Sequence, residues 1–251
     1  MVLIHKRILH SIFRNIIIRL FPKRSVFLEL ITNNTILFEL VKGKKSKKFL
    51  ELKSMNFEQE FSLIHKNFFQ NSTNITNDAP HPAIIYLEFG VAGGNSIMYA
   101  SKMNQNKKSR FIGFDSFEGL PENWRKNHKK GAFSTNGKIP ETTDSRIKFV
   151  KGWFEDTLDV QISNIVKIIS ENPDSQLFIN MDADIFSATL YVLIKLENII
   201  TKDVIIRFDE FGYLYDNNEF QAFKSFILAF NKDFEILLSD KWFRHVTLRI
   251  I

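Results

Sequence analysis

Acidic residues stand at the ends of apolar stretches that have the composition of buried β-strands. Glu88 and Asp115 lie at the ends of the first two such stretches. Asp182 ends the fourth stretch, and the pair Asp209 and Glu210 closes the fifth. Neighbouring parallel strands bring their carboxyl ends to one edge of a sheet, and open α/β sheets bind ligands at that edge. We therefore expect these carboxylates to surround a single ligand site.

A glycine-rich turn, in the sequence EFGVAGGNS, follows the first of these strands. Gly90 and Gly93 would allow the backbone to approach a ligand closely, because glycine has no Cβ atom. The dinucleotide fingerprint would need glycine at positions 92 and 95, where this chain has Ala92 and Asn95. The turn is therefore a poor match for a nicotinamide dinucleotide.

An acid before the turn and another after the next strand suit S-adenosylmethionine (SAM) better. This cofactor has a cationic amino-acid end and a ribose with two hydroxyl groups. We expect Glu88 to contact the methionine end, directly or through water, and Asp115 to accept hydrogen bonds from both ribose hydroxyls. The sequence therefore predicts a SAM site over the first two strand ends.

The other carboxylates would lie close together at the ends of the fourth and fifth strands. Carboxylates packed together repel one another, and their pKa values rise unless a cation neutralises them; a cluster of oxygen ligands suits Mg²⁺. Without a metal, Asp184 would cap the following helix and Glu210 would pair with a basic residue such as Arg207. Asp182 is then the expected general base.

Strand-like and helix-like segments alternate from residue 83 onwards. This alternation predicts right-handed βαβ crossovers, and hence an α/β fold of the Rossmann-like type: a mostly parallel seven-stranded sheet with helices on both faces. The expected strands cover residues 84–89, 110–115, 147–152, 176–182, 203–209, 234–239 and 243–251, the last two as a hairpin, and the helix-like segments include 95–103, 154–170 and 186–200.

A long connection interrupts this alternation. Residues 116–146 contain aromatic residues, glycines and mixed charges but no clear helix or strand. The segment is longer than an ordinary loop, which predicts a lid over the substrate. His128 in this segment is a further candidate base, and a solvated loop histidine is the alternative.

Residues 1–82 are expected to form an N-terminal appendage to a domain over residues 83–251. Residues 1–24 have an amphipathic helical pattern with basic residues largely off the apolar stripe. This helix would pack on the body of the protein or on a second subunit, or it would lie on a membrane surface. The appendage would continue with a hairpin or a helix over 25–41, a solvated loop over 43–48, a helix over 56–71 and a linker over 72–82.

The composition is ordinary for a soluble globular protein, with 44% hydrophobic and 25% charged residues. The chain has no cysteine, which excludes disulfides and thiolate metal sites and is compatible with the cytoplasm. The net charge is +6, but the lysines are spread along the chain rather than arranged in a stripe. We therefore expect a small-molecule partner rather than nucleic acid. Peripheral contact with the inner membrane face and a homo-oligomeric state stay open.

Six segments carry a resemblance to a known family: LEFGVAGGNS, GFDSFEGLPENW, KGAFS, KGWFEDTL, NMDADIFSATLYVL and FDEFGYLYDNNEFQAF. In order and spacing, over residues 84–226, they resemble the macrocin O-methyltransferase family of SAM-dependent enzymes. The resemblance implies a class I methyltransferase fold and methyl transfer to a hydroxyl of a sugar or a glycosylated small molecule. The alternatives are methylation of another small molecule or of RNA, and a catalytically silent glycan-binding protein with the same fold.

The resemblance also implies which residues contact SAM. They are Glu88, Gly90, Gly93, Asp115, Ser116 and Phe117, with Trp153 and Phe154 near the adenine. Core packing is the alternative role for Trp153 and Phe154.

A metal site is implied by the resemblance as well. It would consist of Mg²⁺ held by Asp182, Asp209 and Glu210, and the ion would lower the pKa of the acceptor hydroxyl. Family members that use a metal typically have Asp-Asp-Tyr where this chain has Asp209-Glu210-Phe211. The longer glutamate would reach the ion differently, or not at all.

Overall fold

The structure is a computed structural model, and it describes residues 36, 37, 39–52, 56–69, 81–125, 127–212 and 218–251. These residues belong to two compact units, Met1–Gly43 and Lys44–Ile251, and each is described by itself.

In the first unit, residues 36, 37 and 39–41 are helical. At these positions the helix is the correct alternative, and the hairpin expected over 25–41 is wrong. The rest of that segment, the helix expected over 1–24 and residues 72–80 of the expected linker lie outside the described residues.

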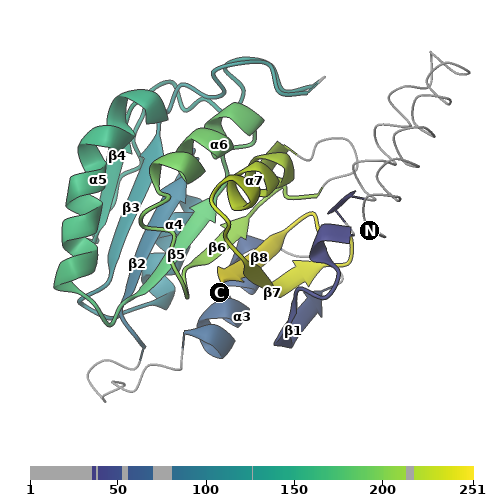
Figure 1. Cartoon of the computed structure of the whole chain (residues 1–251). Coiled ribbons are helices and arrows are strands. Elements are labelled where there is room, and N and C mark those ends of the chain that lie inside the picture. The colour runs from purple at the N-terminus through teal and green to yellow at the C-terminus, as the bar shows by residue number, and fades with distance from the viewer. Residues whose placement is uncertain (1–35, 38, 53–55, 70–80, 126, 213–217) are drawn as a thin grey trace, which may run out of the picture. The chain divides into compact units, whose positions relative to one another are not determined.

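The second unit is built on one eight-stranded sheet with the strand order β1-β7-β8-β6-β5-β2-β3-β4 (Figure 1). The strands are β1 (Lys45–Leu52), β2 (Ile84–Phe89), β3 (Arg110–Asp115), β4 (Ile147–Lys151), β5 (Gln176–Met181), β6 (Ile205–Phe208), β7 (Phe234–Asp240) and β8 (Val246–Ile250). β8 is antiparallel to its neighbours β6 and β7, and all other pairs are parallel. The sheet thus has one strand more than the seven expected.

The additional strand comes from the segment that we expected to be an appendage. β1 pairs in parallel with β7, with Lys45 opposite Ile236 and Glu51 opposite Ser239. The solvated loop expected over 43–48 is therefore wrong for most of its length. Lysine side chains are tolerated in this strand because it lies at the edge of the sheet, where they can remain in solvent.

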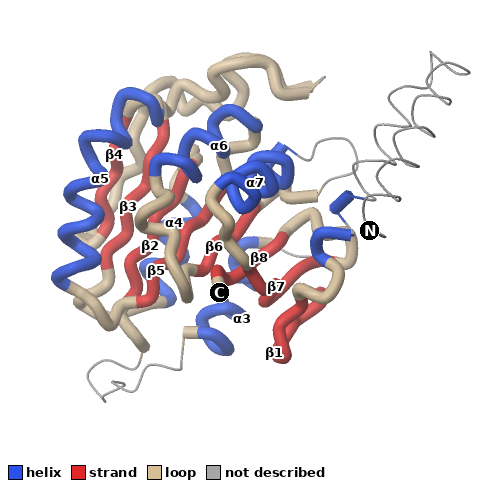
Figure 2. Tube along the Cα trace, in the orientation of Figure 1, coloured by secondary structure: helices blue, strands red, loops and turns tan. Residues whose placement is uncertain are grey.

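Helices cover both faces of the sheet (Figure 2). They are α3 (Phe57–Phe68), α4 (Asn95–Met103), α5 (Phe154–Glu171), α6 (Phe186–Lys195) and α7 (Asn218–Ala229). α3 packs against α4, whereas α6 packs against α5 and α7. Tyr86 of β2 contacts Phe61 of α3, and Phe89 of β2 contacts Phe154 of α5, with ring centroids 6.0 Å and 5.6 Å apart. Side chains three residues apart in a strand point to opposite faces of the sheet. The two groups of helices therefore lie on opposite faces.

β2 lies at the point where the strand order reverses. All six of its residues are buried, as expected for a parallel strand covered on both faces. Its neighbours are β3 on one side and β5 on the other. The chain then leaves β2 for α4 and leaves β5 for α6, and these helices lie on opposite faces of the sheet. Open α/β sheets bind their ligands at such a reversal, beyond the carboxyl ends of the strands.

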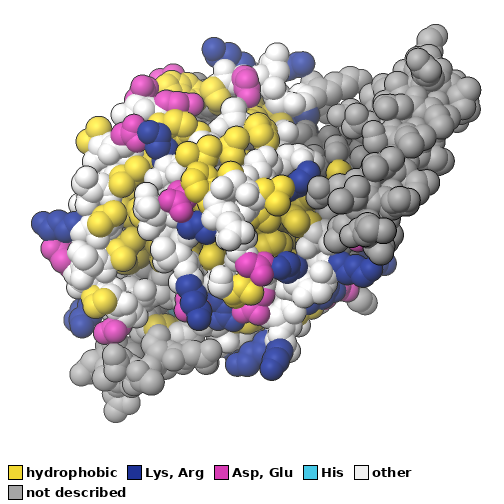
Figure 3. Space-filling view, viewed as in Figure 1, with side chains coloured by type: hydrophobic (Ala, Val, Ile, Leu, Met, Phe, Trp, Pro, Cys, Tyr) yellow, Lys and Arg dark blue, Asp and Glu magenta, His cyan; other side chains and the backbone are white. Residues whose placement is uncertain are grey.

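On the face drawn in Figure 3, Lys and Arg side chains of the described residues are scattered among Asp and Glu side chains. None of the described helices has the length and apolarity needed to cross a bilayer.

Candidate active site

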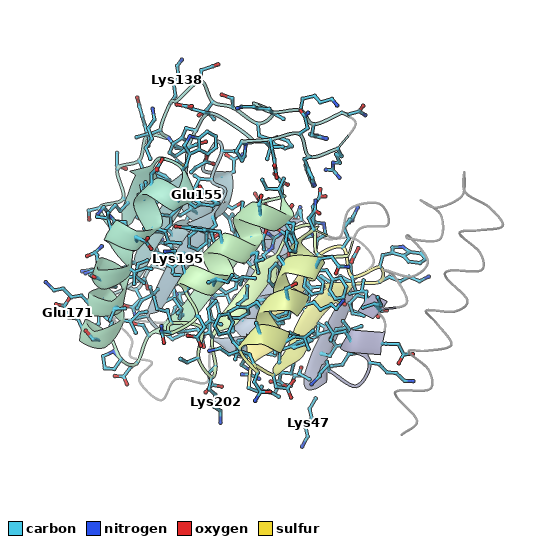
Figure 4. All side chains as sticks on the ribbon, turned by 45° about the horizontal axis from the view of Figure 1, so that its top comes forward. Lys47, Lys138, Glu155, Glu171, Lys195 and Lys202 are labelled. Carbon is cyan, nitrogen blue, oxygen red and sulfur yellow. The ribbon has the colours of Figure 1, made fainter. Side chains whose placement is uncertain are left out.

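A cavity of about 390 Å³ opens beyond the carboxyl ends of the central strands. This volume is within the range of small-molecule sites. Four parts of the chain line it: the strand ends with the turns that follow them, the connection 116–146, the start of α5 and the start of α6. Figure 4 shows the connection extending beyond the helices, with Lys138 at its outer edge and Glu155 at the start of α5.

Gly90 forms the floor of the cavity where β2 ends. Its φ is +94°, and a Cβ atom there would lie 1.8 Å from the backbone oxygen of Asp182. Glycine is thus required because the backbone segments after β2 and β5 approach each other closely. Gly93 differs, because it does not line the cavity and a Cβ atom on it would meet nothing within 4 Å.

Asp115 lines the cavity and holds two turns together. Its Oδ2 atom accepts hydrogen bonds from the backbone of Val91 at 2.7 Å and of Ala92 at 2.8 Å. Its Oδ1 atom accepts one from the backbone of Phe117 at 2.6 Å. A carboxylate has about four acceptor positions, so about one is left for a ligand. While these three hydrogen bonds persist, Asp115 could accept a hydrogen bond from one ribose hydroxyl and not from both, as we had expected.

Two other residues assigned to SAM do not line the cavity. The Glu88 side chain is buried and accepts a hydrogen bond from the hydroxyl of Tyr86, on the sheet face that carries α3. Burial raises the pKa of Glu88 to about 8, although the hydrogen bond from Tyr86 opposes this shift. Phe117 is also buried, and its ring packs edge-on against Phe149 with centroids 6.4 Å apart. Ser116, between Asp115 and Phe117, does line the cavity.

Trp153 and Phe154 lie at the start of α5 and line the cavity. Both side chains are half-buried. The ring of Phe154 also packs edge-on against Phe89. Phe154 thus packs in the core and also lines the cavity, so core packing does not exclude a contact with the adenine.

The acidic residues at the ends of β5 and β6 differ in their surroundings. Burial raises the pKa of Asp182 well above its usual range, and the negative charges of Asp209 and Asp184 raise it further. Burial acts on the pKa of Asp209 in the same direction, but Arg207 and His245 reverse the effect and hold it below its usual range. The Nη2 atom of Arg207 lies 2.5 Å from Oδ1 of Asp209. Asp209 is therefore a neutralised anion, whereas Asp182 readily takes up a proton.

Glu210 is bound to the connection 116–146 rather than directed toward Asp182. Nη1 and Nη2 of Arg125 donate to Oε2 and Oε1 of Glu210 at 3.0 Å and 2.9 Å. This ion pair uses both oxygens of the carboxylate. The alternative that Glu210 pairs with a basic residue is therefore correct, but its partner is Arg125 and not Arg207.

These pairings correct the expected metal site. Among the described residues, no group of three or more His, Asp or Glu side chains lies in a position to hold a metal ion. Arg125 engages Glu210, and Arg207 engages Asp209. Asp182, Asp209 and Glu210 thus do not form a Mg²⁺ site in this arrangement.

The connection 116–146 is ordered around Arg125. The Nε atom of Arg125 donates to Nδ1 of His128 at 3.1 Å, and its guanidinium lies 3.6 Å from the ring centroid of Trp124. The ring of His128 stacks on Phe133 with centroids 5.0 Å apart. Because the guanidinium always donates, Nδ1 of His128 must accept, and the remaining proton of the neutral ring lies on Nε2. His128 is therefore a half-buried residue in the cavity wall, packed on Phe133 and held at Nδ1 by Arg125.

The comparison with known proteins agrees with this geometry. Residues 87–211 match a protein family described as a methyltransferase domain. This part of the chain, 125 of its 251 residues, is thus similar to a methyltransferase domain. No curated protein sequence matches the chain.

Solved structures share the fold of this chain. The calicheamicin methyltransferase CalS11 is 17% identical, with a TM-score of 0.50 over 77% of this chain and 91% of that one. The O-methyltransferase NovP is also 17% identical, with a TM-score of 0.50 over 89% of this chain and 98% of that one. Similarity at this identity establishes a shared fold.

The wall of the cavity includes residues that the sequence did not single out. They are Trp124, Arg125 and Phe133 of the connection. Arg125 and Glu210 are 85 positions apart in the chain, and no local pattern indicates that they pair. The only signal was the number of aromatic and charged side chains in a connection without secondary structure.

Proposed function

We propose that the protein is a SAM-dependent O-methyltransferase that acts on a hydroxyl of a sugar or of a glycosylated small molecule. One observation carries the proposal. Asp115, which ends β3, and Asp182, which follows β5, line the same cavity. A donor held at the first of these strand ends would therefore have its reactive carbon near a carboxylate at the second.

The chemistry of the cavity wall fits SAM. Asp115 has an acceptor position left for a ribose hydroxyl, and Ser116 lines the cavity beside it. The half-buried rings of Trp153 and Phe154 offer apolar surface for the adenine. The backbone at Gly90 can approach the ligand because no side chain intervenes. When bound, SAM supplies a methyl carbon as an electrophile and leaves as the neutral thioether.

Asp182 is the proposed general base. A carboxylate with its usual pKa of about 4 is a poor match for a hydroxyl group. Burial and the neighbouring anions raise the pKa of Asp182 and make it a stronger base. The proton of the acceptor hydroxyl passes to Asp182 while the hydroxyl oxygen forms its new bond to carbon. Magnesium, which the resemblance implies, is not included in the proposal, because Asp209 and Glu210 are engaged by arginines.

The choice of acceptor rests on the resemblance to the macrocin O-methyltransferase family. The fold shared with CalS11 and NovP is compatible with this choice. The cavity is walled on one side by Trp124, His128 and Phe133, and aromatic side chains suit the apolar face of a ring-shaped acceptor.

Two experiments test the proposal. Calorimetric titration of the purified protein with SAM should give saturable one-to-one binding. Incubation of cell extracts with methyl-labelled SAM and the protein should then give a mass-shifted glycoside. Absence of SAM binding refutes the proposal, and a labelled product without a sugar refutes the assignment of the acceptor.

A further inference from the structure

Both acids at the end of β6 are held by arginine side chains. Arg207 is 1% exposed, and all three of its nitrogen atoms are used: Nε donates to Glu60 at 2.6 Å, Nη1 to Asn180 at 2.9 Å and Nη2 to Asp209 at 2.5 Å. The guanidinium is fixed by these contacts, and its charge lies beside the carboxylate of Asp209. Asp209 therefore already has a cationic partner supplied by the fold.

Arg125, from the connection 116–146, is the corresponding partner of Glu210. Its Nε donates to His128, and its Nη1 and Nη2 form the two-point ion pair with Glu210. The indole of Trp124 covers one side of the guanidinium. Side-chain exposure is 28% for Arg125 and 22% for Glu210, so solvent has limited access to the pair.

A divalent cation would have to displace these contacts. Two-point pairs between arginine and a carboxylate are charge-assisted and about twice as strong as neutral hydrogen bonds. Mg²⁺ loses its water reluctantly and needs near-octahedral oxygen ligands. A metal at this place would need carboxylate oxygens from Asp209 and Glu210, and arginines engage both oxygens of Glu210 and the Oδ1 atom of Asp209.

We propose that Arg125 and Arg207 take the place of a divalent cation at the end of β6, so that this chain transfers a methyl group without a bound metal ion. The inference rests on the proposed function. Arg125 is a positioning residue in this scheme: it neutralises Glu210 and fixes the connection 116–146 over the cavity. The hydroxyl proton passes to Asp182, and no metal-bound oxygen is required.

The first test is metal binding by the full-length protein. Calorimetric titration of the wild type with MnCl₂ or MgCl₂ should show no saturable binding, with or without SAM. The affinity for SAM should be the same in EDTA and in MgCl₂. Saturable Mn²⁺ binding by the wild type overturns the inference.

The second test releases Glu210 from its partner. Arg125→Gln should gain saturable Mn²⁺ binding, half-complete at a concentration at least about tenfold below the highest at which the wild type shows none, because a half-buried carboxylate loses its cation. Arg125→Gln combined with Glu210→Gln should lose this gain. Lys129→Gln is the matched control, since it removes one positive charge from an exposed residue of the same connection. Mn²⁺ binding by Arg125→Gln no tighter than by Lys129→Gln overturns the inference.

The same titrations separate this inference from the proposed function. Lack of SAM binding by the wild type refutes the proposed function, and the inference falls with it. Binding of SAM together with saturable Mn²⁺ binding by the wild type refutes the inference alone.

Discussion

The Cα atom of Gly90 faces the backbone oxygen of Asp182 so closely that a Cβ atom would lie 1.8 Å from it. Gly90 directly follows the strand that leads to the proposed cofactor side of the cavity, and Asp182 is the proposed base on the acceptor side. Their backbones are further linked because the amide of Asp182 donates to the carbonyl of Phe89 at 2.9 Å. The segments that follow β2 and β5 are therefore held together by main-chain atoms. Substitutions of neighbouring side chains would leave this contact intact.

We expect Gly90→Ala to destabilise the protein by at least about 2 kcal/mol. The positive φ of this residue disfavours a Cβ atom, and backbone atoms of Asp182 cannot move aside like a flexible side chain. Denaturant titration gives the free energy of unfolding. Gly93→Ala is the matched control and should change it by less than about 0.5 kcal/mol, because nothing lies within 4 Å of that Cβ position. Equal effects of the two substitutions would contradict this account of the turn.

We expect Asp115→Asn to weaken SAM binding by at least about tenfold and to lower the melting temperature. An amide group would present N–H donors to backbone amides that now donate to a carboxylate. Calorimetry with SAM and thermal denaturation measure the two effects. Asp174→Asn, in an exposed turn, should have neither effect. Full SAM affinity in Asp115→Asn would contradict the assigned role.

We expect Asp182→Asn to reduce the rate of methyl transfer about 10²–10⁴-fold while SAM affinity is retained. In the wild type the rate should rise with pH until the carboxyl group of Asp182, with its raised pKa, is ionised. The variant should lose this part of the pH profile. Single-turnover measurements on the product identified with labelled SAM give the rates. A pH profile that is unchanged in the variant would assign the base elsewhere.

We expect the ionisation of Glu88 to reduce stability as the pH rises. The folded-state pKa of about 8 exceeds the usual value of 4.5, so the folded protein binds the proton more tightly than the unfolded chain. Stability from this group is full below about pH 4.5 and is lost progressively up to about pH 8. Glu88→Gln should therefore lose less stability than the wild type between these pH values. Denaturation midpoints across this range test the slope, and parallel curves would contradict the shift.

We expect Glu60→Ala to destabilise the protein by about 3–5 kcal/mol. The substitution leaves the buried guanidinium of Arg207 without one of its anions and removes the acceptor of the Thr247 hydroxyl, which lies 2.7 Å from Glu60. The exposed Glu58 in the same helix turn provides the control, and Glu58→Ala should be nearly neutral. Denaturant titration of both variants makes the comparison. A small effect of Glu60→Ala would show that the network contributes little to stability.

Local patterns were sufficient for the central elements of the fold. β2 and α4 begin and end at the residues expected from the sequence. The reason is that the signals are local: an apolar run ends at a glycine-rich turn, and a small polar residue after the turn begins the helix. The alternation of strands and helices also placed Asp115 and Asp182 at one edge of the sheet. β1 was not foreseen, because its polar composition resembles that of a loop and only pairing with β7 makes it a strand.

The sequence by itself determined the Rossmann-like α/β architecture and the edge of the sheet at which the acids gather. Only the tertiary structure decided what those acids do. Glu210 pairs with Arg125 across 85 positions and Arg207 with Glu60 across 147, and Glu88 lies on the face opposite to α5 and outside the cavity wall. The physical reason is that periodicity fixes the direction of a side chain within its own strand or helix. The partner of a charge depends instead on which distant segment the fold brings within hydrogen-bonding distance.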